Sequence, residues 1–179
     1  MVLFSITATL TRADATLQDR YLTIYVKLHD ADNLQTKKDY LGALLIYKRA
    51  LLELEIMRFD PSWERALLEK RIQGCKETIT HLTPLATKQL LAQPNLADPA
   101  GPDQSTLFDE GFKLAKEQRY WGALDQFEQY ITIVEIMRHI DPKWDTPSNA
   151  KRMGQVQAET ERLKKIEIQL QEKPYQQKP

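Results

Sequence analysis

One stretch of this sequence occurs twice, and the repeat constrains the fold more than any single residue does. Tyrosine, glycine, alanine and leucine stand at positions 40, 42, 43 and 44, and again at 120, 122, 123 and 124, an offset of 80 residues (43 to 123). Each copy continues with Glu-Ile-Met-Arg and a Pro-x-Trp signal, which ends at Trp63 or Trp144. The tryptophans are 81 positions apart (63 to 144), so the second copy has one extra residue before its proline. We therefore expect two related units.

Within each unit, apolar residues recur at spacings of three and four, which is typical of amphipathic helices. The first unit spans residues 16–82 and the second spans residues 105–172. The predicted helices span, in chain order, residues 16–36, 40–59, 63–82, 105–116, 120–139 and 148–172. A proline stops the helix before it and is favoured at the start of the next, so each Pro-x-Trp signal should separate a second helix from a third. Outside the first ten residues no segment alternates as a strand does, and the predicted class is all-α.

The segment between the units has a different composition. Residues 83–104 contain several prolines, beginning with Pro84, and predict a linker in which only residues 85–92 have the pattern of a short helix. A linker of this length either wraps the surface of one domain or tethers two separate units. At the other end of the second unit, residues 173–179 are expected to form a frayed tail.

The first residues bear on the compartment. Residues 1–15 are similar to the apolar core of a secretory signal with an Ala-x-Ala site at Ala13 to Ala15, but they lack a positively charged start. We expect an exported or periplasmic protein, with a cytoplasmic protein as the alternative. The single cysteine, Cys75, excludes an intramolecular disulfide and does not decide the compartment. No run approaches the roughly 20 apolar residues that span a bilayer, so no transmembrane segment is predicted.

Charge and motif content argue against two classes of function. Lys+Arg and Asp+Glu both number 25, so the basic excess of a general nucleic-acid binder is missing. The three histidines have no partners at the spacing of a metal site or a catalytic triad, and the nearest cluster, His29 with Asp30 and Asp32, does not close a zinc site. The six glycines form no phosphate loop. We therefore predict no catalytic residues, no metal site and no cofactor.

Small and aromatic residues within the two hairpins keep a fixed spacing. A small residue in the first helix precedes an alanine in the second by twelve positions; an aromatic residue follows that alanine by four positions and a small residue follows it by seven. The residues at these positions are Ala31, Ala43, Tyr47 and Ala50 in the first copy, and Gly111, Ala123, Phe127 and the larger Tyr130 in the second. This spacing resembles that of the tetratricopeptide repeat family, in which small side chains let two antiparallel helices approach closely.

The resemblance implies two helical hairpins, each followed here by a third helix, in a right-handed α-solenoid-like or bundle arrangement. The period of 80 residues departs from the family, whose repeats follow one another at about 34 residues. The remaining positions of the repeat signature are Tyr40, Gly42, Trp63, Tyr120, Gly122 and Trp144. The two tryptophans are interpreted as staples that hold each third helix against its hairpin, with a paired binding platform as the alternative.

In function, the resemblance implies a non-enzymatic scaffold or adaptor that binds a protein or peptide partner. Some family members bind acidic tails through cations on the first helices, and these cations are missing here. A groove of apolar and mixed character is expected instead, suited to a partner helix or an extended segment. The candidate groove residues are Tyr25, Leu28, Asp32, Gln35, Phe108, Phe112 and Lys116. Two alternatives remain open: core packing for each aromatic residue, and self-association through the long second helices as a structural subunit.

Overall fold

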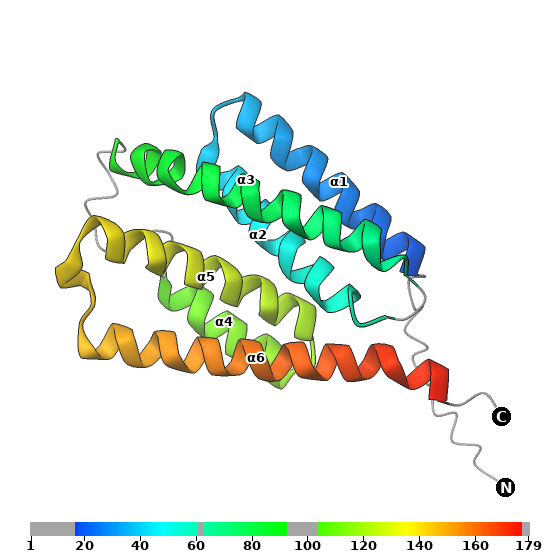
Figure 1. The fold of residues 1–179 in the computed structure, drawn as a ribbon. Helices are drawn as coiled ribbons and strands as arrows, with labels where there is room; N and C mark the ends of the chain where they lie inside the picture. Colours follow the sequence, from blue (N-terminus) through cyan, green and yellow to red (C-terminus); the bar gives the residue numbers. More distant parts are fainter. Residues whose placement is uncertain (1–16, 61–62, 93–103, 177–179) are drawn as a thin grey trace, which may run out of the picture.

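The computed structural model describes residues 17–60, 63–92 and 104–176, and every regular element within these ranges is a helix (Figure 1). The elements are α1 (Leu17–Thr36), α2 (Tyr40–Met57), α3 (Arg65–Leu91), α4 (Gln104–Lys116), α5 (Tyr120–Ile140), the short 3-10 helix η2 (Pro142–Trp144) and α6 (Pro147–Gln176). The predicted all-α class is confirmed. The N-terminal segment 1–15, residues 93–103 of the predicted linker and the last residues of the tail lie outside the described ranges.

The two hairpins close with the same turn. The amide of Asp39 donates to the carbonyl of Leu34 at 2.9 Å, and the amide of Arg119 donates to the carbonyl of Leu114 at the same distance. One residue earlier, Lys38 and Gln118 both have a positive φ, of 64° and 60°. A left-handed residue with these bonds ends a helix and reverses the chain. The repeated sequence therefore encodes a repeated local structure, 80 residues apart (38 to 118).

The central helices α2 and α5 show the repeat in their burial. Each position from 40 to 50 is buried or half-buried in the same way as its equivalent from 120 to 130. In the third helices the offset is 81 (75 to 156), because the extra residue before the second proline intervenes. Buried residues at this offset are Ile72 and Met153, Cys75 and Val156, and Leu82 and Leu163. The two units thus share a core pattern that allows each residue of one to be compared with its equivalent in the other.

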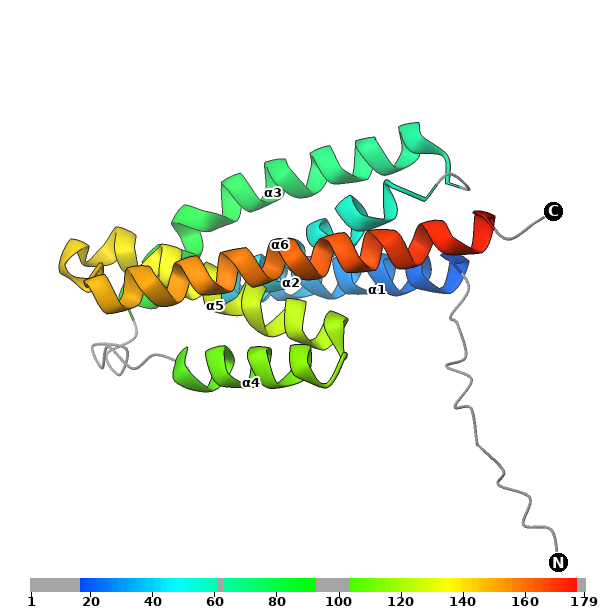
Figure 2. The ribbon, with the colours of Figure 1, turned by 90° about the horizontal axis from the view of Figure 1, so that it is seen from below.

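The units pack back to back through their second helices. In Figure 1, α2 and α5 run in opposite directions, and contacts join α2 with α5, α3 with α5 and α2 with α6. Lys48 and Glu128 occupy equivalent positions, and Lys48 Nζ lies 3.9 Å from Glu128 Oε1. Equivalent residues of α2 and α5 therefore meet at the contact between the units. The start of α1 and the end of α6 lie at the same end of the molecule, with α3 and α4 on opposite faces (Figure 2).

The structure corrects the predicted end of the third helix. The helix was expected to end near residue 82 and to give way to a linker, but α3 continues through Pro84 to Leu91. Leu82, Ala86 and Leu90 recur at intervals of four and are all buried. Burying a leucine side chain contributes about 1.5–3 kcal/mol, so two such residues offset the roughly 3 kcal/mol that a proline costs inside a helix.

A side chain from this extension also caps the first hairpin. Gln89 Oε1 accepts a hydrogen bond of 3.0 Å from the amide of Leu41, which belongs to the unpaired first turn of α2. Asp39 accepts from the amide of Gly42 at 3.1 Å in the same turn. The final helix likewise extends beyond its predicted end, because α6 reaches Gln176 and includes the first residues of the predicted tail. Within the described ranges, no helix combines the length and the apolar character needed to cross a membrane.

Candidate functional site

The two units differ sharply at one site, which lies between the first and third helices of each unit. In the second unit, Phe112 of α4 lies against Phe127 of α5, with ring centroids 5.0 Å apart. The Phe108 ring of α4 lies 4.8 Å from that of Phe112 and 5.9 Å from that of Tyr130 in α5. Arg152 of α6 lies over the Phe108 ring at 5.6 Å. Gly111 leaves room for the Phe127 ring, since an added Cβ would lie 2.7 Å from its Cδ1. The half-buried rings of Phe108 and Phe112 therefore lie between Phe127 of α5 and Arg152 of α6.

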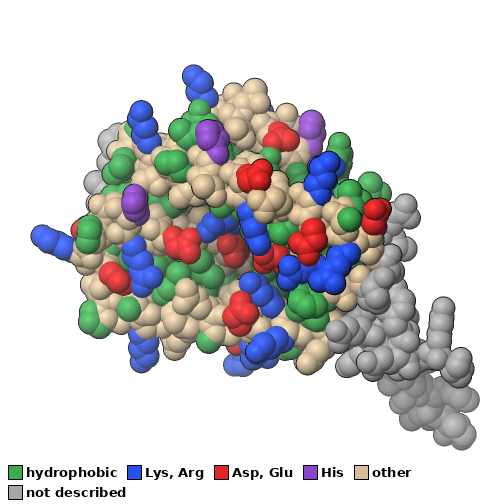
Figure 3. Space-filling view, viewed as in Figure 1, with side chains coloured by type: hydrophobic (Ala, Val, Ile, Leu, Met, Phe, Trp, Pro, Cys, Tyr) green, Lys and Arg blue, Asp and Glu red, His purple; other side chains and the backbone are tan. Residues whose placement is uncertain are grey.

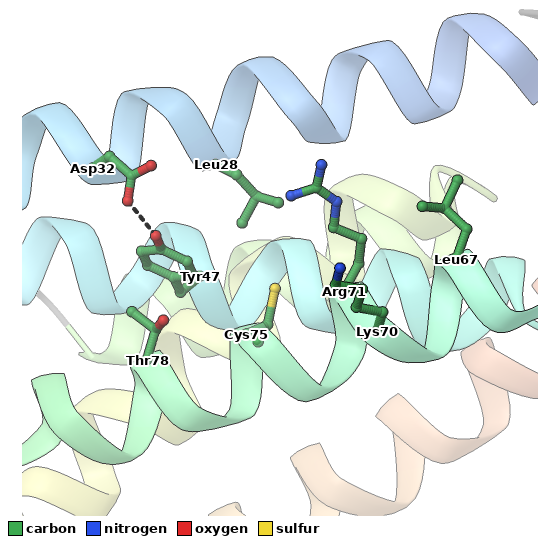
Figure 4. A pocket seen from close by; sticks show the side chains of 9 residues that line it. Leu28, Asp32, Tyr47, Leu67, Lys70, Arg71, Cys75 and Thr78 are labelled. Carbon is green, nitrogen blue, oxygen red and sulfur yellow. Dashed lines mark hydrogen bonds between the residues drawn. The ribbon is translucent and has the colours of Figure 1, made fainter.

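The equivalent positions of the first unit are Leu28, Asp32 and Tyr47, and there the space stays open. A groove of about 410 Å³ lies between α1 and α3, above α2 (Figure 4). The residues that line it are Leu28, Asp32, Tyr47, Leu67, Lys70, Arg71, Gly74, Cys75 and Thr78. An added Cβ on Gly74 would meet no atom within 4 Å, so this glycine widens the groove on the α3 side. We call this space the α1–α3 groove.

The floor of the α1–α3 groove is polar at one end. The Tyr47 hydroxyl donates a hydrogen bond to the Asp32 carboxylate, as Figure 4 shows. Burial of the ring, together with this bond, holds the pKa of Tyr47 well above its usual value. Burial also raises the pKa of the Cys75 thiol to about 11, so the thiol is protonated at neutral pH. A protonated phenol and a protonated thiol are poor nucleophiles.

The rim of the groove carries exposed side chains of both apolar and basic character. Tyr25 of α1 is 55% exposed, and the Arg71 guanidinium lies 5.9 Å from the centre of its ring. Leu67 and Lys70 are exposed on the α3 side. Figure 4 places Leu28 between Asp32 and Arg71, so an apolar surface separates the acidic end of the groove from the basic end.

The predicted groove residues divide between the two units. Tyr25, Leu28 and Asp32 belong to the α1–α3 groove or its rim, while Gln35 is half-buried further along α1 and is absent from the lining. Phe108 and Phe112 belong to the aromatic cluster of the second unit and Lys116 is exposed at the end of α4. The described residues therefore show two separate environments where the sequence suggested one groove.

Sequence reasoning missed the wall that α3 contributes. Leu67, Lys70, Arg71 and Gly74 recur at helical spacing and line the groove, whereas the predicted groove residues all belong to the first helix of each unit. Two signals in the sequence point to this wall. The third helix is an addition to the two-helix repeat, and the replacement of Phe112 by Asp32 at an equivalent position marks a change from core to polar surface.

The two tryptophans lie against their own units. The Trp63 ring packs against Tyr21 of α1 with centroids 4.9 Å apart, and Trp144 is buried at the end of η2. Asn149 Nδ2 donates to the carbonyl of Trp144 at 2.7 Å. These contacts favour the stapling interpretation over the paired platform, since Trp144 leaves little surface for a partner.

Other chemistry has little support in the described part of the chain. Figure 3 shows acidic and basic side chains interspersed over one face, with the histidines on it lying apart from one another. Within the described ranges, no three histidine, cysteine or carboxylate side chains gather where they could hold a metal ion. A second cavity of about 530 Å³ lies where α3 meets α5, beside the Lys48–Glu135 ion pair of 2.7 Å. It belongs to the contact between the units.

That contact contains carboxyl groups in an unfavourable setting. Burial raises the pKa of Glu128, and Lys48 and Lys164 oppose the shift. Burial likewise raises the pKa of Asp125, against the effect of Arg49, which forms an ion pair with it. A carboxyl whose pKa is higher in the folded protein than in the unfolded chain stabilises the fold at low pH. The stability is lost as the pH rises from the ordinary value of 4.5 through the folded value of Glu128.

We therefore expect Glu128→Gln to gain stability relative to the unaltered protein as the pH rises from 4 to 7. The glutamine imitates the protonated carboxyl, so the free energies of unfolding of the two proteins should be most similar at pH 4. The measurement is the free energy of unfolding in urea at several pH values. Glu161→Gln, at a largely exposed carboxyl on α6, serves as the control. Its free energy of unfolding should differ from that of the unaltered protein by the same amount at every pH. A flat or falling difference for Glu128→Gln would contradict the assignment of Glu128 as a buried carboxyl.

No family model matches the chain, and comparisons with curated proteins and with solved structures give no match. The resemblance to the tetratricopeptide repeat family therefore rests on the spacing of residues in this sequence.

Proposed function

We propose that this chain is a non-enzymatic protein–protein interaction module, and that its α1–α3 groove binds a segment of a partner protein. The observation that carries the proposal is the difference between the two units. Three phenylalanines fill one site, whereas Leu28, Asp32 and Tyr47 leave the equivalent site open and partly polar. Filling the open site with apolar side chains would stabilise the fold, so its openness argues for a role outside folding.

The tetratricopeptide-like interpretation gains support from the burial of its signature positions. Ala31, Ala43, Ala50 and Ala123 are fully buried at the crossings of the hairpins, as small residues of that family are. We propose two atypical repeats that pair back to back as a bundle, each with a third helix that covers part of its hairpin. In this interpretation the third helix replaces the neighbouring repeat of a longer array.

Self-association through the long second helices was the alternative, and one observation now weighs against it. The apolar faces of α2 and α5 that motivated the idea are buried against the rest of the same chain. A second copy would need another surface.

The proposal can be tested by placing a photo-crosslinking amino acid, p-benzoylphenylalanine, in place of exposed Tyr25 and, as a control, in place of Glu161 on α6. We expect irradiation of cells to attach a protein to position 25 and to leave position 161 without the same product. The product should disappear in a groove-filled variant that carries Leu28→Phe, Asp32→Phe and Tyr47→Phe, the side chains of the second unit. Equal products at both positions, or a product that survives in the groove-filled variant, would count against the proposal.

A further inference from the structure

We propose that the α1–α3 groove selects an acidic segment of the partner, in which an apolar side chain enters the groove and a neighbouring carboxylate pairs with Arg71 and Lys70. The inference rests on the proposed function, because it names the chemistry of the segment bound at the same site. Its basis is the arrangement of charge around the groove.

Lys70 and Arg71, the two cations at the groove, have no carboxylate within ion-pair distance among the described residues, although cations close to them in the first unit do. Lys76 lies 3.2 Å from Glu55, and Arg58 lies 3.6 Å from Glu69. Arg71 lies over the Tyr25 ring, which holds the guanidinium beside the groove without neutralising its charge. A guanidinium in this position offers hydrogen-bond donors in a planar fork, the geometry that a carboxylate matches.

The distribution of polarity along the groove sets the direction of the bound segment. Asp32 lies at the opposite end from Arg71, with Leu28 between them, and would repel a carboxylate there (Figure 4). Leu28 and Leu67 provide apolar surface, and the groove volume of about 410 Å³ accommodates a large apolar side chain. The complementary segment therefore carries its carboxylate toward Arg71, an apolar side chain at Leu28, and a hydrogen-bond donor toward Asp32.

The second unit provides a control that distinguishes the effect of the groove from the effect of the two cations alone. The sequence Lys-Arg-apolar at residues 70–72 recurs as Lys-Arg-apolar at residues 151–153, so both units carry the same cations at equivalent positions. In the first unit these cations border the open α1–α3 groove, whereas in the second unit Phe108 and Phe112 occupy the positions of Leu28 and Asp32. Charge attraction alone would act at both pairs, whereas the proposed site requires the first.

The test is a selection of random peptides displayed on phage against the full chain, followed by fluorescence anisotropy with the selected peptides. We expect enrichment of peptides with an aspartate or glutamate beside a large apolar residue. The affinity of these peptides should fall about tenfold or more in Lys70→Glu/Arg71→Glu, because two attractive contacts become repulsive. It should stay within about twofold in the matched variant Lys151→Glu/Arg152→Glu, since surface charges far from the site act weakly at physiological salt.

The outcomes separate the charge inference from the proposed function. If selected peptides lack acidic residues, or bind Lys70→Glu/Arg71→Glu as tightly as the unaltered chain, the charge inference is overturned. If those same peptides do not bind the groove-filled variant, the result would still support the groove as the binding site. Peptides that bind the groove-filled variant normally would overturn both proposals, and so would a selection that enriches none. The charge-reversed variant changes exposed side chains only, so its fold can be checked by circular dichroism before binding is measured.

Discussion

Reversing the charge of Lys48 should cost this protein much of its stability. The Lys48 side chain is 15% exposed, and its Nζ lies 2.7 Å from Glu135 Oε2 and 3.9 Å from Glu128 Oε1. Lys48→Glu would place a third carboxylate beside that of Glu128, which is 16% exposed, and that of Glu135, which is 53% exposed. Loss of one partner from a buried ion pair costs about 3–5 kcal/mol, which is a large part of the 5–15 kcal/mol typical of a domain. Urea denaturation should show this loss as a lower midpoint.

A matched change at the surface provides the control. Lys113→Glu alters a 61% exposed side chain that pairs with Glu110 on the same helix, and pairs of this kind contribute about 0–1 kcal/mol. Adding Glu128→Lys to Lys48→Glu should recover part of the loss, because opposite charges then meet again at the contact between the units. If Lys48→Glu is no more harmful than Lys113→Glu, the two units do not pack through this pair.

Replacing Gly111 with alanine is expected to destabilise the protein by about 1–3 kcal/mol, the usual cost of overpacking a core. Helix propensity alone predicts a gain of about 1 kcal/mol for the same change, so the sign of the effect distinguishes the two influences. An added Cβ would lie 2.7 Å from Cδ1 of Phe127, whose ring is fully buried and cannot move aside. Thermal unfolding should show the loss as about 2–4 °C for each kcal/mol in a protein of this size.

Gly154→Ala is the comparison for this prediction. Gly154 lies inside α6, and an added Cβ there would meet no atom within 4 Å. Without a clash, the smaller freedom of the unfolded chain should raise the free energy of unfolding by about 0.4–1 kcal/mol. Equal stability of the two variants would show that the aromatic cluster of the second unit is packed differently from the arrangement described.

The sequence alone predicted the parts of the fold that depend on local patterns. The repeated sequence around Gly42 and Gly122 predicted two equivalent hairpins. The structure has the same turn in both, at Lys38 and Gln118. The helix boundaries of the hairpins agree with the apolar spacing, because burial of one face decides where an amphipathic helix begins and ends.

Features that depend on distant contacts could not be predicted in this way. Pro84 indicates a helix end by its local chemistry, yet the burial of Leu82 and Leu90 on either side extends α3 past it. The α1–α3 groove depends on where α3 lies relative to α1, and no spacing within one helix reports that position. Phe108 and Phe112 resemble exposed groove residues in sequence, but ring contacts with Tyr130 and Phe127 of α5 place them in an aromatic cluster.

An amide-resolved NMR titration of the full chain with an acidic peptide from the phage selection tests the central claim most directly, because equivalent residues of the two units report separately. We expect amide shifts at residues that line the α1–α3 groove, among them Leu28, Gly74 and Thr78. The amide resonances of their equivalents in the second unit, Phe108, Gln155 and Glu159, should not shift. Shifts of equal size in both units, or shifts confined to the second, would contradict the account of one open groove that binds a partner.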